Sequence, residues 1–268
     1  MTEEIVDIAR KKVVYEMPGM DDVTVRKDHE FGAAGSGSSM DVYYPSRPED
    51  GVLTPVVIIV AGYPDAGVAR VFGRSFKEMG SSVSWAKLIA ASGLAAITYS
   101  NVEPEADLDA LLAHLRRNAE NLGVDGNTIG LWASSGNVPL ALSPLMQGGT
   151  ECLKCAVLCY GYTLDVPGAH GVAEAAAKFG FANPAAGKSV TDLRRDVPLF
   201  LARAGQDQFP HLNEMLDRFV AGALTCNLPV TLVNHPQGPH AFDLLQNTEP
   251  SREVIRQILA FLRFHLLQ

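Results

Sequence analysis

Three short segments of the sequence carry residue types that together could perform nucleophilic catalysis. They are Ile129-Gly-Leu-Trp-Ala-Ser-Ser-Gly-Asn-Val-Pro-Leu-Ala141, Gly205-Gln-Asp207 and Gly238-Pro-His-Ala-Phe242. A serine hydroxyl is a poor nucleophile unless a neighbouring base takes its proton, and an imidazole titrates close enough to neutrality to be that base. A carboxylate beside the imidazole would fix its tautomer and stabilise the imidazolium. We therefore expect a serine, His240 and Asp207 to act together.

The choice of serine depends on the residues around a sharp turn from strand to helix. Such a turn is strained, and it needs small residues two positions to either side of its central residue. Centring the turn on Ser135 places Ala133 and Asn137 at those positions, whereas centring it on Ser134 places the bulky Trp132 there. Ser135 is thus the predicted nucleophile. The alternative is that both serines simply cap a helix.

The predicted base and acid each have rivals. His240 follows a glycine-containing loop segment, whereas His235 immediately precedes a proline at the end of a predicted strand. Asp207 directly follows a predicted strand and a glycine, which Asp165 and Asp243 do not. We therefore expect His240 to be the general base and Asp207 to orient it.

The elements that must position these residues follow from hydrophobic periodicity. Short apolar runs predict strands at 56–60, 94–99, 128–133, 155–160, 198–202 and 230–233. Helices are predicted at 84–91, 108–122, from the serines to about 145, at 212–224 and at 252–267. This alternation indicates a mostly parallel sheet with helices on both faces. Two earlier strands, at 23–26 and 40–44, would add an antiparallel hairpin at one edge.

One segment interrupts the alternation. Residues 161–190 are rich in alanine and glycine, with one short helix predicted at 172–179. We expect a single domain spanning 1–268, in which 161–190 is a small insertion that covers the site as a cap.

The chain order serine, aspartate, histidine, the strand–serine–helix segment and the Gly-x-His-x-Phe ending resemble the dienelactone hydrolase-like branch of the α/β-hydrolases. Acetyl-esterases and prolyl-oligopeptidase catalytic domains are resembled less closely. The resemblance covers residues 40–268 and implies hydrolysis of a carboxylic ester through an acyl-enzyme, without cofactor or metal. Dienelactone hydrolases use cysteine where this chain has Ser135, so their lactone substrate is not implied. Ala133 and Asn137 depart from the usual Gly-x-Ser-x-Gly pattern.

The resemblance also implies an oxyanion hole built from two backbone N–H groups. Gly136, which follows the nucleophile, would supply one donor. The loop after strand 56–60 would supply the other, from Tyr63 or, alternatively, Gly62; Pro64 has no N–H to offer. Many relatives have His-Gly in this loop, and the Ala61 found here removes a bracing contact rather than a donor.

Composition narrows the range of partners. Asp and Glu number 30 against 22 Lys and Arg, and a net charge of -8 argues against nucleic acid. No run of roughly 18 apolar residues predicts a membrane span, and the acidic start Met1-Thr-Glu-Glu4 is unlike a secretory signal. We expect a cytoplasmic protein whose partner is a small-molecule ester; a homo-oligomer is left open.

Two further patterns suggest other chemistry but have simpler explanations. Cys152, Cys155 and Cys159 have a spacing that could hold a metal, yet alternation along a strand would point Cys152 and Cys155 to opposite faces. We expect the 4 cysteines to be reduced thiols without metal. Residues 32–39 resemble a phosphate-binding loop but lack its lysine, so a turn is expected.

Two other functions compete with ester hydrolysis. A peptidase or amidase could use the same three residues. A non-catalytic ligand-binding protein could retain the fold, although it would have no need of all three residues.

Overall fold

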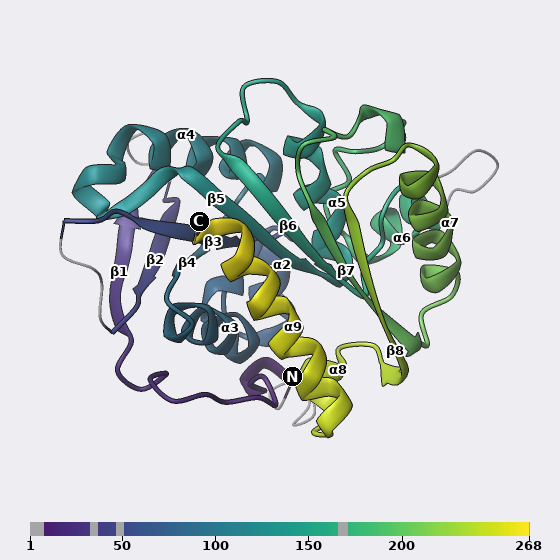
Figure 1. Cartoon of the computed structure of the whole chain (residues 1–268), viewed down its shortest axis with the longest axis horizontal. Helices are drawn as coiled ribbons and strands as arrows, with labels where there is room; N and C mark the ends of the chain where they lie inside the picture. Colours follow the sequence, from purple (N-terminus) through teal and green to yellow (C-terminus); the bar gives the residue numbers. More distant parts are fainter. Residues whose placement is uncertain (1–7, 33–36, 47–50, 166–170, 268) are drawn as a thin grey trace.

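Eight strands form one central sheet in the computed structural model, which describes residues 8–32, 37–46, 51–165 and 171–267. Their order across the sheet is β1-β2-β4-β3-β5-β6-β7-β8 (Figure 1). The strands are β1 (Thr24–Glu30), β2 (Ser39–Tyr44), β3 (Thr54–Ile59), β4 (Ala95–Tyr99), β5 (Val124–Ser134), β6 (Leu153–Cys159), β7 (Leu199–Gln206) and β8 (Val230–Pro239). β1 pairs antiparallel with β2, and β2 with β4, whereas β3 to β8 are parallel. This is the predicted fold class, with the antiparallel pair at one edge.

Helices cover both faces of the sheet (Figure 1). One face carries α3 (Gly80–Ala91) and α9 (Glu249–Leu266), and the other carries α4 (Pro104–Leu122), α5 (Val138–Leu142) and α7 (Leu212–Thr225). Three further helices each follow the carboxyl end of a strand: α2 (Asp65–Phe72), α6 (Gly171–Phe179) and α8 (Phe242–Leu245). The 3-10 turns are η1 (Phe76–Glu78), η2 (Ser135–Asn137), η3 (Ser143–Met146) and η4 (Val190–Asp192).

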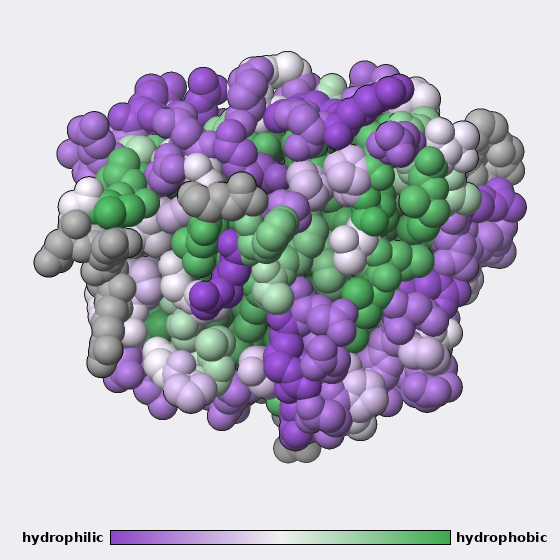
Figure 2. Space-filling view, viewed as in Figure 1, coloured by the Kyte–Doolittle hydropathy of each residue, from purple (hydrophilic) through white to green (hydrophobic). Residues whose placement is uncertain are grey.

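The sheet separates two apolar cores because its central strands are buried on both faces. Val56 and Ile58 pack under α4, whereas Val57 and Ile59 pack under α3, and all four are fully buried. The sequence of such a strand is a continuous apolar run, in which apolar and polar residues do not alternate. Figure 2 shows hydrophilic side chains over the outward surface of the lower part of α9, with apolar side chains visible beside it.

The structure differs from the sequence prediction in several local features. The helix expected to run from the serines to about 145 is instead η2, a short α5 and η3, because Pro139 and Pro144 cannot donate the backbone hydrogen bonds of a continuous helix. α2 was not predicted, although Gly73 ends it in a left-handed conformation typical of a helix end. β5 begins earlier and β8 ends later than expected.

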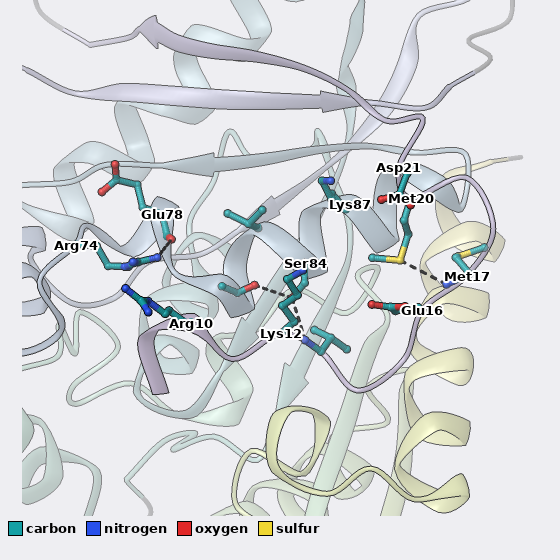
Figure 3. Close-up of a pocket in the computed structure, with 13 residues that line it drawn as sticks. Arg10, Lys12, Glu16, Met17, Met20, Asp21, Arg74, Glu78, Ser84 and Lys87 are labelled. Carbon is teal, nitrogen blue, oxygen red and sulfur yellow. Dashed lines mark hydrogen bonds between the residues drawn. The ribbon is translucent and has the colours of Figure 1, made fainter. Parts of the chain in front are cut away.

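The segment before β1 lies across the start of α3. Val13 N–H donates to Ser84 Oγ over 3.0 Å. A hollow of about 530 Å³ lies beside this contact, and Figure 3 shows the residues that line it. The hollow carries charges of both signs and includes none of the predicted site residues; its charged side chains are Arg10, Lys12, Glu16, Asp21, Arg74, Glu78 and Lys87. A Cβ at Gly80 would lie 2.5 Å from the carbonyl oxygen of Arg10. Gly80 therefore permits the close packing of this segment.

Gly80→Ala is expected to destabilise the fold by about 1–3 kcal/mol, because the added methyl group would overlap backbone atoms. The free energy of unfolding in urea measures the effect. Gly67→Ala is the matched control, since Gly67 lies in α2 and a Cβ there would meet nothing within 4 Å. The control should be neutral or up to about 1 kcal/mol more stable. Equal stability of the two variants would contradict the packing argument.

Candidate active site

The turn between β5 and η2 places Ser135 in a left-handed backbone conformation, with φ of 55°. Residues other than glycine rarely adopt this conformation, and they do so where the surrounding structure imposes it. Ser134, in contrast, is extended, with φ of -134° and ψ of 152°. The strain at the strand-to-helix turn is therefore carried by Ser135.

Ser135, His240 and Asp207 lie in one hydrogen-bonded row. His240 Nε2 is 2.9 Å from Ser135 Oγ, and His240 Nδ1 is 2.6 Å from Asp207 Oδ2. Asp207 follows the end of β7 and His240 follows the end of β8, so neighbouring parallel strands bring the two side chains together. The second oxygen of Asp207 accepts the Phe209 N–H over 2.9 Å, which fixes the orientation of the carboxylate.

Two aromatic rings enclose the imidazole of His240. The Phe209 ring centroid is 4.5 Å away and the Tyr160 centroid 4.9 Å away, and both meet His240 edge to face. The His240 side chain is 10% exposed and that of Asp207 is fully buried. Little water therefore competes for the bond between them, while the imidazole still reaches Ser135.

The rival residues have other partners. His235 Nε2 pairs with Ser251 Oγ at 3.0 Å, and burial lowers the pKa of this histidine. Asp165 accepts two backbone N–H groups from the first turn of α6. Asp243 accepts the Trp85 indole N–H over 2.7 Å. The structure thus brings His240 and Asp207, rather than these three residues, to the serine.

The loop after β3 lies against the serine turn. Gly62 N–H donates to Asn137 Oδ1 over 2.7 Å, and the Gly62 carbonyl accepts the Ala182 N–H over 2.8 Å. The N–H of Gly62, the alternative oxyanion donor, is therefore already engaged. Among the described residues, the N–H of Tyr63 has no hydrogen-bond acceptor. Tyr63 and Gly136 are the predicted donors that remain.

Asn137 links the turn to this loop. It is 4% exposed, and its Nδ2 also donates to the Ser134 carbonyl over 3.0 Å. A Cβ at Gly62 would lie 2.9 Å from Asn137 Cα, which shows how closely the two backbones approach. Sequence reasoning treated Asn137 as a tolerated departure from glycine. The sequence signal that could have revealed its role is the combination of an amide side chain in the turn and a loop after β3 that lacks the histidine found in many relatives.

The side chain of Tyr63 covers Gly136. A Cβ at Gly136 would lie 2.2 Å from Tyr63 Oη and 2.6 Å from Phe181 Cδ1, and the two rings meet edge to face at 5.8 Å. Burial raises the pKa of Tyr63 to about 12, so its hydroxyl stays protonated at neutral pH. Phe181 belongs to the segment 161–190, whose described part therefore lies beside the serine turn; residues 166–170 lie outside the described residues.

An apolar pocket of about 690 Å³ adjoins this loop. Tyr63 and Pro64 form the side next to the serine turn, and Phe179 and Gly180 line it from the segment 161–190. The remaining lining residues come from α2 and the segment after it, and are Ala66, Gly67, Val68, Arg70, Val71, Phe72, Phe76 and Met79. Ser135, Asp207 and His240 do not line this pocket; it meets the candidate site at Tyr63, whose hydroxyl lies over Gly136.

The cysteines lie on both faces of the sheet. Cys152 packs in the core under α4, whereas Cys155 and Cys159 pack in the core under α3 and α9. Burial raises the pKa of the Cys155 thiol to about 12, which keeps it protonated. In the described ranges, no group of three or more His, Cys, Asp or Glu side chains is placed to hold a metal ion. No described helix has the length and hydropathy needed to cross a membrane.

The comparisons with known proteins show the fold. No family model and no curated protein sequence matches the chain. Among solved structures, a carboxyl esterase 2 from Tuber melanosporum is similar over 96% of this chain and 91% of its own, with a TM-score of 0.69 and 16% identity. A fungal esterase from Rhizomucor miehei is similar over 93% of this chain and 84% of its own, with a TM-score of 0.65 and 18% identity. The carboxylesterase EstE1, from a metagenomic library, is similar over 98% of this chain and 94% of its own, with a TM-score of 0.69 and 17% identity. The chain has the α/β-hydrolase fold.

Asn137→Ala is expected to lower kcat for ester hydrolysis at least about tenfold with little change in KM, because the loop that carries the Tyr63 N–H would lose its brace. Steady-state kinetics with p-nitrophenyl acetate measure both constants. Asn118→Ala on α4 is the control, since Asn118 bonds only a carbonyl of its own helix in the described structure. A variant with unchanged kcat would show that the brace is dispensable.

Proposed function

We propose that this protein is a serine hydrolase that cleaves a carboxylic ester through an acyl-enzyme intermediate. The observation that carries the proposal is the row from Ser135 Oγ through both nitrogens of His240 to Asp207, at 2.9 and 2.6 Å. Similarity in fold to solved esterases supports the ester as substrate. The finer resemblance to dienelactone hydrolases rests on the sequence motifs alone.

The geometry supports a two-step mechanism. Ser135 Oγ attacks the ester carbonyl carbon while His240 Nε2 takes its proton, and Asp207 stabilises the resulting imidazolium. The oxyanion of the tetrahedral intermediate is bound by the N–H groups of Tyr63 and Gly136. When the intermediate collapses, His240 returns the proton to the leaving alcohol, and Ser135 holds the acyl group. Water, activated by the same imidazole, then attacks the acyl-enzyme and regenerates the serine.

Two observations favour catalysis over ligand binding alone. The left-handed conformation of Ser135 costs on the order of 1–3 kcal/mol, and binding a ligand does not require it. In addition, Ser135 and Asp207 each hydrogen bond to a different ring nitrogen of His240, so the three side chains are oriented toward one another. An amide is the second candidate substrate, since the same groups could cleave it.

The apolar pocket beside Tyr63 supplies a place for the acyl chain in this proposal. It adjoins the loop that carries one oxyanion donor, so an acyl group bound to Ser135 could extend into it. Its volume of about 690 Å³ exceeds what an acetyl group needs. We therefore propose that the substrate carries a medium-length apolar acyl chain.

Ser135→Ala is expected to abolish hydrolysis of p-nitrophenyl esters and labelling by a fluorophosphonate probe, because the nucleophile is lost. Ser134→Ala should retain a measurable fraction of both, since Ser134 is extended and outside the row. Turnover and the mass of the labelled peptide are the measurements. Labelling at Ser134, or full activity of Ser135→Ala, would place the nucleophile elsewhere. Cleavage of p-nitroanilides at rates matching the esters would favour the amidase.

The chain-length preference tests the apolar pocket. We expect kcat/KM to rise from p-nitrophenyl acetate to the butyrate and hexanoate, by roughly 1–3 kcal/mol of transition-state binding. Val71→Lys should remove this gain while leaving the acetate unaffected, because Val71 lines the pocket and is 44% exposed, so that a charge there should not unfold the protein. The acetate rate of the same variant is the internal control. A parallel loss for all chain lengths would show that the pocket does not hold the acyl group.

A further inference from the structure

A second buried carboxylate lies three residues after His240. Asp243, on α8, is 2% exposed. Its Oδ1 accepts the Tyr160 hydroxyl over 2.6 Å, and its Oδ2 accepts the Trp85 indole N–H over 2.7 Å. The mechanism described above does not use this group.

The surroundings of Asp243 offer a donor to each carboxylate oxygen but no permanent counter-charge. An ionised carboxylate accepts hydrogen bonds through both oxygens. Among the described residues, no lysine or arginine forms an ion pair with it. Burial is the largest effect and raises the pKa of Asp243 above its usual value, although the two donors and the nearby His240 oppose it. The cationic group that could face this charge is therefore the imidazolium of His240.

Tyr160 connects Asp243 to His240. It follows the end of β6 with φ of 35°, an unusual conformation for a tyrosine. Its hydroxyl bonds Asp243, and its ring meets the imidazole edge to face at 4.9 Å. The ring that limits the movement of His240 is thus itself held by the buried carboxylate.

Two tethers hold the elements around this carboxylate. Val14 N–H donates to the Asp243 carbonyl over 2.8 Å, and the neighbouring Val13 N–H donates to Ser84 on α3. Trp85, the next residue of α3, carries the indole donor to Asp243. Figure 3 shows the segment that contains these valines running beside α3, with the bond to Ser84 drawn. Asp243 is therefore held in place through both its side chain and its backbone carbonyl.

We propose that Asp243 is a positioning residue for His240: it holds the Tyr160 ring against the imidazole, and its charge stabilises the imidazolium that forms when Ser135 loses its proton. This inference rests on the proposed function. Asp207 remains the direct partner of Nδ1, so Asp243 acts through space and through Tyr160.

The other titratable groups near His240 are neutral when the enzyme works near pH 7. Burial raises the pKa of the Tyr160 hydroxyl and of the Cys159 thiol on β6 well above their usual values, and burial with the Asp207 charge raises that of Tyr162. Phe209, on the loop after β7, carries no charge. The two carboxylates, Asp207 and Asp243, therefore set the electrostatic field at the imidazole. Because a negative charge favours the protonated form, removing either charge must lower the pKa of His240.

The test is the pKa of His240, measured by NMR titration of the imidazole in the intact protein, with the resonance assigned from the spectrum of His240→Gln. Asp243→Asn keeps the size of the side chain and removes its charge: the amide oxygen can still accept the Trp85 N–H, and the amide NH2 can donate to the Tyr160 hydroxyl oxygen. We expect the pKa of His240 to fall by about half a unit, less than in Asp207→Asn, because the charge lies beyond direct contact. Asp125→Asn, at the far end of β5 from Ser135, is the matched control and should change it by no more than about 0.1 unit.

The pH dependence of ester hydrolysis is the second measurement. In Asp243→Asn the acidic limb of kcat/KM should move to lower pH by the shift seen in the NMR titration, and kcat near neutrality should fall a few fold with KM nearly unchanged. If Asp243→Asn does not fold, as judged by circular dichroism, Asp243→Ser carries the same expectation. A folded neutral variant whose His240 pKa matches the Asp125→Asn control would overturn the proposal. Absence of Ser135-dependent hydrolysis in the unmodified protein would instead overturn the proposed function and leave the titration result standing.

Discussion

The close approach of three backbone segments at Ser135 is the constraint on which the rest of the site depends. Gly62, Gly136 and Gly161 all lie where a side chain cannot fit: their Cβ atoms would fall 2.9 Å from Asn137 Cα, 2.2 Å from Tyr63 Oη and 2.2 Å from Val138 Cγ2. The absence of these side chains lets the turn, the loop after β3 and the end of β6 meet. That meeting holds the serine in its left-handed conformation and sets the candidate oxyanion donors beside it.

How much could be predicted from the sequence depended on whether the signal was local. The buried strands were recognisable because parallel strands covered on both faces form continuous apolar runs. Ser135, Asp207 and His240 each follow a predicted parallel strand, and the carboxyl ends of parallel strands share one edge, so their positions along the chain were enough to group them. The roles of Asn137 and Asp243 depend on partners 75 and 158 residues away, Gly62 and Trp85, and no periodicity records such contacts. The break in the helix after Ser135 was readable from two prolines, but the apolar pattern obscured it.

The unusual residues around the turn make sense as a set. Relative to the pattern that the sequence resembles, Ala61 stands where many relatives have a bracing histidine, and Asn137 stands where they have a glycine. In the structure the amide of Asn137 supplies a brace from the opposite side, bonding Gly62 N–H and the Ser134 carbonyl together. An unpaired buried N–H costs about 1–3 kcal/mol, so satisfying Gly62 also removes a penalty that would act against the folded loop. Two departures from the common pattern thus compensate for each other.

The same reasoning links the buried polar groups to the strain at the site. Ser135 and Tyr160 both adopt positive φ values, and each is held by hydrogen bonds that reach across the sheet edge rather than along one strand. Strained residues persist where surrounding contacts over-determine them. Here those contacts come from His240, Asp207 and Asp243, so loss of any one should relax the local backbone as well as the chemistry. In the proposed mechanism, stability and catalysis are therefore coupled at this edge, because the groups that fix the backbone would also carry the charge.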